Sequence, residues 1–145
     1  MDQAALAHEI AGRHLDRIGG PITALREIAA EFGYIERAHM KGVADAFNLT
    51  VAEVRGIVGF YSDLNTEPRG RTHIRICQAE ACQSVGARAL TAAAVARFGA
   101  GLGETAADGS VSLEAVYCLG LCTSGPAATV DDRVIVRATP DALAP

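Results

Sequence analysis

The four cysteines of this chain fall into two close pairs, and this pattern most limits how the chain can fold. Cys77 and Cys82 have four residues between them, and Cys118 and Cys122 have three. Each pair directly follows a short apolar stretch that is typical of a β-strand. We therefore expect two strand ends to bring all four thiols to one edge of a sheet, as a four-sulfur site.

Three kinds of site use four thiols. A [2Fe–2S] cluster takes four terminal thiolates, two on each iron, and pairs with these spacings can loop around it. A structural zinc ion is also held by four thiolates, although its pairs usually enclose two residues. Disulfides are disfavoured, because Met1–Ala4 lacks the basic start of a secretory signal and cytoplasmic chains rarely keep disulfides. The spacing favours the cluster and leaves zinc and unliganded or redox-active thiols open.

Composition narrows the class of protein. With 145 residues, 50% of them hydrophobic, the chain can bury a core in one domain or two small ones. A net charge of −4 makes nucleic acid a poor default partner. No apolar run approaches the ~20 residues that span a bilayer. We expect a soluble, cytoplasmic protein that would reach a membrane only through partner proteins.

Residues 1–65 have the apolar spacing of helices. From Ile22 to Phe32 the apolar positions recur every three or four residues, which places them on one helix face. Thr50 and Glu53 form a capping box, so another helix should begin there. The prediction is a helical bundle over residues 1–65, with helices at Ala5–Ile18, Ile22–Phe32, Arg37–Phe47 and Thr50–Phe60.

Part of this bundle scans as a helix-turn-helix. Residues 43–54 place a short polar turn between two helices, as DNA-binding motifs do. Residues 1–71, however, hold eight Lys and Arg against ten Asp and Glu, and the second helix offers little besides Arg55 for phosphate contacts. A DNA-binding regulator is therefore the weaker alternative.

Residues 66–145 read as a second, α/β domain. A turn-rich linker at Leu64–Arg71 leads into an alternating strand, and a long helix follows the first cysteine pair. Ser84 is the expected N-cap of that helix, whose positive end would then face the cysteines. The predicted elements are strands Thr72–Ile76 and Val111–Tyr117, helix Ser84–Phe98, a hairpin of Ala127–Val130 with Arg133–Val136, and a short helix from Thr139.

Together the two parts predict an α+β chain: a helical bundle followed by a sheet of four strands. The segments Cys77–Gln83 and Tyr117–Cys122, about forty residues apart, resemble the thioredoxin-like [2Fe–2S] ferredoxins. This family includes the E subunit of NADH dehydrogenase (complex I), its counterpart in NAD-linked hydrogenases, and the gamma subunit of NAD-dependent formate dehydrogenases. The two segments are most similar to the formate dehydrogenase gamma subunit.

The resemblance implies a thioredoxin-like domain, with a cis proline expected at Gly125-Pro126. It implies a [2Fe–2S] cluster, for which the expected iron ligands are Cys77, Cys82, Cys118 and Cys122. It also implies a one-electron carrier beside an FMN- and NAD-binding subunit and a molybdenum-containing catalytic subunit of one complex. The E subunit of complex I or its hydrogenase counterpart is the alternative within the family, and an iron–sulfur-sensing DNA-binding regulator or a zinc-stabilised interaction module is the alternative outside it.

No catalytic residues are predicted. The chain has no phosphate-binding Walker loop, no dinucleotide fingerprint and no arrangement of nucleophile and base. His73 lies close to the expected cluster edge, but a strand histidine exposed to solvent explains it, and the four cysteines already fill the site. We therefore expect an electron-transfer subunit and not an enzyme acting alone.

Overall fold

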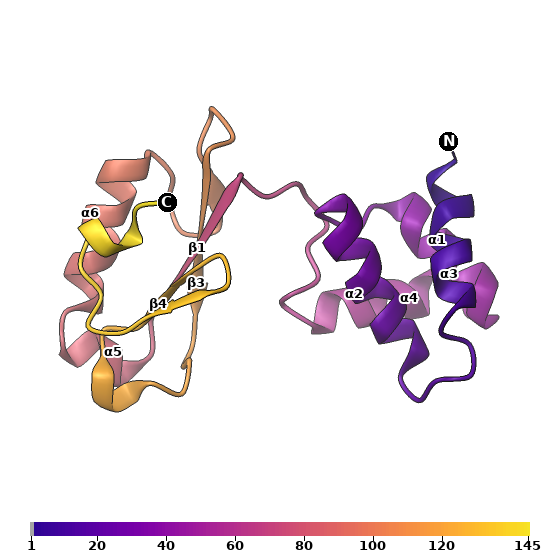
Figure 1. Ribbon diagram of the computed structural model, residues 1–145, viewed down its shortest axis with the longest axis horizontal. Coiled ribbons are helices and arrows are strands. Elements are labelled where there is room, and N and C mark those ends of the chain that lie inside the picture. The colour runs from indigo at the N-terminus through magenta and orange to yellow at the C-terminus, as the bar shows by residue number, and fades with distance from the viewer. Residues whose placement is uncertain (1) are drawn as a thin grey trace. The chain divides into compact units, whose positions relative to one another are not determined.

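The structure is a computed structural model that describes residues 2–145, and it divides into two compact units, Met1–Pro68 and Arg69–Pro145 (Figure 1). Over residues 2–68 the regular elements are all helices, and the second unit combines a sheet with helices. Each unit has its own buried apolar core, as an independently folding domain requires. Across residues 2–145, no helix is both long and apolar enough to cross a membrane.

Four helices form the first unit. Three of their ends follow local sequence rules. Asp2 caps the first helix by accepting the N–H of Ala4 at 3.0 Å. Thr50 and Glu53 form the predicted capping box, and Asn48 ends the third helix in a left-handed conformation. The helices are α1 (Gln3–Gly12), α2 (Gly20–Phe32), α3 (Arg37–Phe47) and α4 (Val51–Phe60).

The predicted first helix is wrong at its C-terminal end, because α1 stops at Gly12 and not at Ile18. The following residues form turns, in which the N–H groups of Arg13 and His14 bond to carbonyls three residues back. Leu15 is 49% exposed and Ile18 is fully exposed, so neither side chain joins the core. Without apolar contacts to hold another turn, the helix ends at the glycine.

The core of the helical unit forms where α1 and α3 approach closely. A Cβ atom at Gly42 would lie 2.2 Å from the carbonyl oxygen of Ala4, so only glycine permits this approach. Around this contact, α2 and α4 contribute the fully buried side chains of Leu25, Ile28 and Val54. Burial of these aliphatic groups is the main force that stabilises so small a bundle.

The second unit is built on a mixed sheet of five strands, whereas the sequence predicted four. The strand order is β2-β3-β1-β4-β5, with β1 and β3 parallel and the other neighbours antiparallel. The strand missed is β2, two exposed residues among glycines, which have no apolar alternation to reveal them. The strands are β1 (Thr72–Cys77), β2 (Glu104–Thr105), β3 (Val111–Val116), β4 (Ala128–Val130) and β5 (Arg133–Ile135).

Helix α6 (Ala87–Phe98) and the 3₁₀ turn η2 (Asp141–Leu143) share a core with the sheet (Figure 1). Leu90 and Leu143 pack there with Ile74, Ile76 and Leu113 of the two central strands. The thioredoxin-like order of strand, helix, strand and hairpin is therefore confirmed. The Gly125-Pro126 bond is cis, as expected.

The start of the long helix differs from the prediction. A separate short helix, α5 (Glu80–Ser84), comes first and contains Cys82, while α6 begins after Gly86 in a left-handed conformation. Ser84 is not an N-cap, because its hydroxyl donates to the carbonyl of Ala81 at 2.7 Å. The predicted start of the long helix at Ser84 is therefore wrong, although Ala87, the first residue of α6, packs with Cys77 and Cys82.

Candidate functional site

Parallel pairing of the two central strands brings the cysteine pairs to one sheet edge. Cys77 is the last residue of β1 and lies opposite Val116, the last residue of β3. Cys118 follows two residues later, and its backbone N–H donates to Cys77 Sγ at 3.4 Å. The chain can turn back at this point because Cys118 itself has a positive φ of 76°.

The second cysteine pair has the separation of two ligands on one metal ion. Cys118 Sγ lies 3.7 Å from Cys122 Sγ. Two thiolates about 2.3 Å from a tetrahedral ion are about 3.8 Å apart, so one iron fits between them with little movement. Gly120, also at a φ of 76°, directs its N–H to Cys118 Sγ at 3.4 Å.

The two pairs differ sharply in burial. Cys77 and Cys82 are 1% and 2% exposed and pack against Ala87 and Ala127. Cys118 and Cys122 are exposed. One side of the four-thiol site therefore faces the protein interior, and the other faces solvent.

Backbone N–H groups stabilise one of the buried thiolates. Burial by itself raises the pKa of Cys77, but N–H groups of Ala79, Cys118 and Leu119 and the thiol of Cys82 together hold it below its usual value. Burial raises the pKa of Cys82. Cys77 is thus the thiol of this pair that ionises first, and metal binding requires the thiolate form.

The donor set suits a binuclear cluster better than a single ion. The thiols form one buried and one exposed pair. A [2Fe–2S] cluster requires two pairs, one for each iron, together with N–H groups directed at sulfur.

The prediction that His73 is exposed to solvent is wrong. Its side chain is 13% exposed, and Nε2 lies 2.7 Å from Glu114 Oε2. Burial and the charge of Arg69 hold its pKa below the usual value, against the opposing effect of Glu114. The other histidines belong to the helical unit, where His39 is buried beside the Phe32 ring and His14 Nε2 lies 2.6 Å from Glu27 Oε2.

Two glutamines at the site had no role in the prediction. Gln78 and Gln83 directly follow the first two cysteines, and their side chains are hydrogen bonded to each other at 3.0 Å. The signal that could have found them is their repetition at the same position after each cysteine of one pair.

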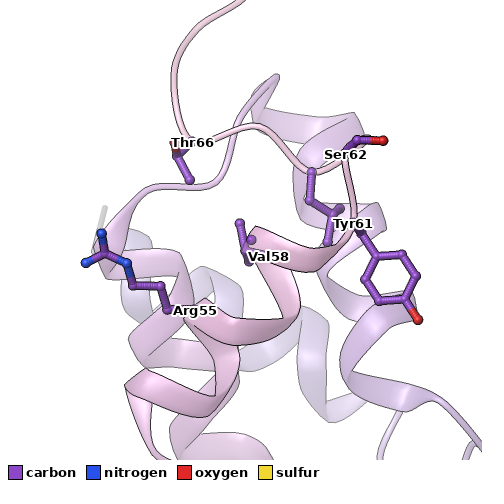
Figure 2. A pocket seen from close by; sticks show the side chains of 7 residues that line it. Arg55, Val58, Tyr61, Ser62 and Thr66 are labelled. Atoms are coloured by element: carbon purple, nitrogen blue, oxygen red, sulfur yellow. The ribbon is translucent and has the colours of Figure 1, made fainter. Parts of the chain in front are cut away.

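A shallow hollow of about 320 Å³ lies at the end of α4, and its lining residues all belong to the helical unit. Figure 2 shows Arg55 and Thr66 on one side of it and Ser62 on the other, with Val58 between them and the Tyr61 ring turned outwards. Its lining contains one cation and no carboxylate or histidine. The hollow therefore lacks the paired acid and base that hydrolytic chemistry needs.

Residues 7–145 match the family model described as "Thioredoxin-like [2Fe-2S] ferredoxin". The E subunit of the NADH-quinone oxidoreductase of Pseudomonas aeruginosa is 29% identical over 143 residues, which cover 99% of this chain and 86% of the relative. The corresponding protein of Escherichia coli K12 is 28% identical, with 98% and 85% covered. That of Aquifex aeolicus is 33% identical over 108 residues, with 74% and 68% covered.

Among solved structures, the fold is similar to that of a NAD⁺-reducing [NiFe]-hydrogenase in its H₂-reduced state. The TM-score is 0.74 at 22% identity, and the match covers 86% of this chain but only 21% of the hydrogenase chain. At this identity the similarity establishes the fold alone. The chain corresponds to about a fifth of that larger protein chain.

Proposed function

The chain belongs to the thioredoxin-like [2Fe–2S] ferredoxin family, and from this premise we propose that Cys77, Cys82, Cys118 and Cys122 hold its [2Fe–2S] cluster. We further propose that the chain is the electron-transfer subunit, of the gamma type, in a NAD-dependent formate dehydrogenase complex. When bound, such a cluster supplies one-electron redox chemistry. The chain's own residues hold the sulfurs, direct N–H groups at them and shield one side from water.

The ligand assignment rests mainly on the sulfur geometry. The 3.7 Å separation of Cys118 Sγ and Cys122 Sγ supports their sharing one iron. The hydrogen bond from the Cys118 N–H to Cys77 Sγ supports placing the second iron beside Cys77 and Cys82, because it ties the two pairs together. Hydrogen bonds to the sulfurs stabilise negative charge on them, and such bonds raise the reduction potential of iron–sulfur centres.

The exposed pair supports electron exchange with a partner protein. Cys118 and Cys122 lie in a stretch, residues 115–130, that contains no Asp, Glu, Lys or Arg, although 21% of the chain is charged. Tyr117, directly before the pair, is 76% exposed. Loss of charge and an exposed tyrosine are typical of the centre of a protein–protein interface. We propose that the FMN-bearing, NAD-binding subunit docks here.

The choice among complexes rests on the cysteine segments. The residues between the cysteines favour a formate dehydrogenase, in which a further subunit would carry molybdenum. The relatives reported above are subunits of NADH-quinone oxidoreductases, so complex I remains the alternative within the family. We also propose that residues 1–65 and 66–145 are separate domains in a cytoplasmic complex, a division supported by the two compact units.

Metal and sulfide analysis tests the cluster assignment. Protein isolated without air should contain two irons and two acid-labile sulfides per chain, and after reduction it should give the paramagnetic signal of one unpaired electron. One zinc per chain and no sulfide would reject the assignment.

Mild purification of the whole complex tests the system. A co-purifying flavoprotein together with a molybdenum subunit that oxidises formate supports the proposal. A membrane-associated complex without molybdenum would replace it with the complex I alternative.

A further inference from the structure

A side-chain hydrogen bond closes the loop between the two buried cysteines. Gln83 Nε2 donates to Gln78 Oε1 at 3.0 Å. Because each glutamine directly follows a cysteine, this bond joins the chain at the two places from which the thiols of Cys77 and Cys82 leave it. Any change in the separation of these two residues must stretch or break the bond.

The same bond is anchored to the neighbouring helix and strand. Gln78 Nε2 donates to Thr91 Oγ1 at 2.9 Å and to the carbonyl of Ile76 at 3.3 Å. Thr91 lies in α6, and its hydroxyl donates to the carbonyl of Ala87 at 2.8 Å. The loop is therefore fixed to the end of β1 on one side and to the first turns of α6 on the other.

The direction of donation along this chain of bonds is determined. The single hydroxyl hydrogen of Thr91 is used on Ala87, so Thr91 Oγ1 must accept from the Gln78 amide. That choice turns the Gln78 oxygen towards Gln83, which must then present its NH₂ group. As a result, Gln83 Oε1 is buried without a hydrogen-bond partner.

The unpaired oxygen matters because its desolvation offsets what the bond contributes to folding. A buried acceptor without a donor is destabilising by an amount similar to that gained from an ordinary hydrogen bond. The bond between the two glutamines therefore does little for overall stability, and its main effect is to hold the loop in one conformation. The exposed pair has a different support, because the N–H of Gly120 reaches Cys118 Sγ without any side chain.

We infer that Gln78, Gln83 and Thr91 are positioning residues that keep the Cys77 and Cys82 sulfurs at the separation one iron requires. This inference rests on the proposed ligand assignment. The glutamines make no contact with the cluster in this role. They act through the backbone to which the two thiols are attached.

The main test is Gln83→Met, which removes the bond and the unpaired Gln83 oxygen at nearly the same volume but leaves Gln78 Oε1 without its donor. The melting temperature should fall by about 4–8 °C, as expected for the loss of one hydrogen bond in a unit of this size, and transfer of iron to a chelator should become about fivefold faster, the factor that one hydrogen bond supplies. The visible circular dichroism of the cluster should also change. Thr91→Val, which lies outside the cysteine loop, should give a smaller change of the same kind.

The matched control is Thr105→Val. It breaks the bond between Thr105 Oγ1 and Ser112 Oγ, 2.7 Å long, at strand β2 and away from the loop between Cys77 and Cys82. It should leave the rate of iron release and the visible spectrum as they are in the wild type. An equal effect of Thr91→Val and Thr105→Val would show general loosening of the unit and would overturn the inference.

A double variant tests whether the two glutamines act through the hydrogen bond that they share. Gln78→Met with Gln83→Met should release iron no faster than the more affected single variant, because both substitutions remove the same bond. If Gln83→Met fails to fold, Thr91→Val decides alone, and an unchanged release rate and spectrum reject the inference. Wild-type protein without iron and sulfide would refute the proposed function, whereas unchanged variants of a cluster-bearing protein would refute only this inference.

Discussion

Replacing Gly125 with alanine should reveal how tightly the segment after the second cysteine pair packs against the first pair. A Cβ atom at this position would lie 2.9 Å from Val85 Cγ2 and 3.3 Å from Cys82 Sγ. The φ of Gly125 is −68°, which alanine adopts without strain. The cost of the substitution therefore arises from crowding alone.

The size of the destabilisation depends on whether the crowded side chains, Val85 and Cys82, can move away. Extra atoms in a packed site typically cost about 1–3 kcal/mol. Val85 is 53% exposed and can turn towards solvent, so we expect the lower part of this range, about 1–2 kcal/mol. For a unit the size of Arg69–Pro145, each kcal/mol lowers the melting temperature by about 4–8 °C. Cys82 is only 2% exposed and has no such freedom, so the position of its sulfur should change.

Thermal melting and visible circular dichroism of Gly125→Ala, Val85→Ala and the double variant separate the two contacts. Val85→Ala in the Gly125→Ala background should restore most of the stability, while the altered cluster spectrum persists. Gly59→Ala is the control, because nothing lies within 4 Å of its added methyl group. A Gly125→Ala protein with the melting temperature and spectrum of the wild type would refute the close packing of these two segments.

Three further predictions concern other parts of the chain. Serine at Cys77, Cys82, Cys118 or Cys122 should lower the iron content and reshape the signal of the reduced protein, and an unchanged spectrum would remove that cysteine from the ligand set. Gly42→Ala should destabilise the helical unit by about 2 kcal/mol or more, since its Cβ would meet the Ala4 carbonyl at 2.2 Å, yet leave the cluster spectrum unchanged. Thr50→Ala should remove a cap worth about 1 kcal/mol and reduce the loss of stability in acid. Hydrogen bonds from the backbone and the side chain of Thr50 lower the pKa of Glu53. The ionised Glu53 therefore contributes to the free energy of unfolding above its unfolded-state pKa, and this contribution is lost as the pH falls through its folded-state pKa. Chemical denaturation at neutral and acidic pH measures both effects.

Helix positions were predictable where local rules and tertiary packing agree. The face from Ile22 to Phe32 and the capping box at Thr50 both specify their helices within a few residues. The rules failed where a local pattern lacked a packing partner. The stretch after Gly12 contains Leu15 and Ile18, yet neither is buried, and the helix does not continue through them.

The sheet was harder to predict at its edge. Strands β1 and β3 have alternating or continuous apolar residues and were located correctly. Strand β2 is held by two pairings, Glu104 with Leu113 and Thr105 with Ser112, and both of its residues are exposed. A strand that buries no side chain leaves no periodic pattern in the sequence.

At the candidate site, the sequence indicated which residues gather but not how they are held. The prediction that a strand ends before each cysteine pair was enough to place all four thiols at one edge of the sheet. The break between α5 and α6 depends on Gly86 at a φ of 108°, a conformation that could not be distinguished from an ordinary helical residue beforehand. A helix that begins at Ser84 would leave Gln83 outside any helix, whereas Gln83 lies in the separate short helix α5, so the predicted cap concealed the glutamine network.

In the proposed function, electron exchange depends on the difference between the two cysteine pairs. Tunnelling weakens steeply with distance, so a partner must approach the sulfurs that solvent can reach, which belong to Cys118 and Cys122. The buried pair is held by a side-chain network and by backbone N–H groups directed at Cys77, whereas the exposed Cys118 receives the N–H of Gly120, which needs no bulky side chain around it. This division keeps the exposed side free for a partner while the interior side fixes the geometry. Replacing Tyr117, which is 76% exposed, with aspartate should therefore slow electron exchange with the flavoprotein but leave the iron content unchanged. Equal rates for Tyr117→Asp and the wild type would place the docking surface elsewhere.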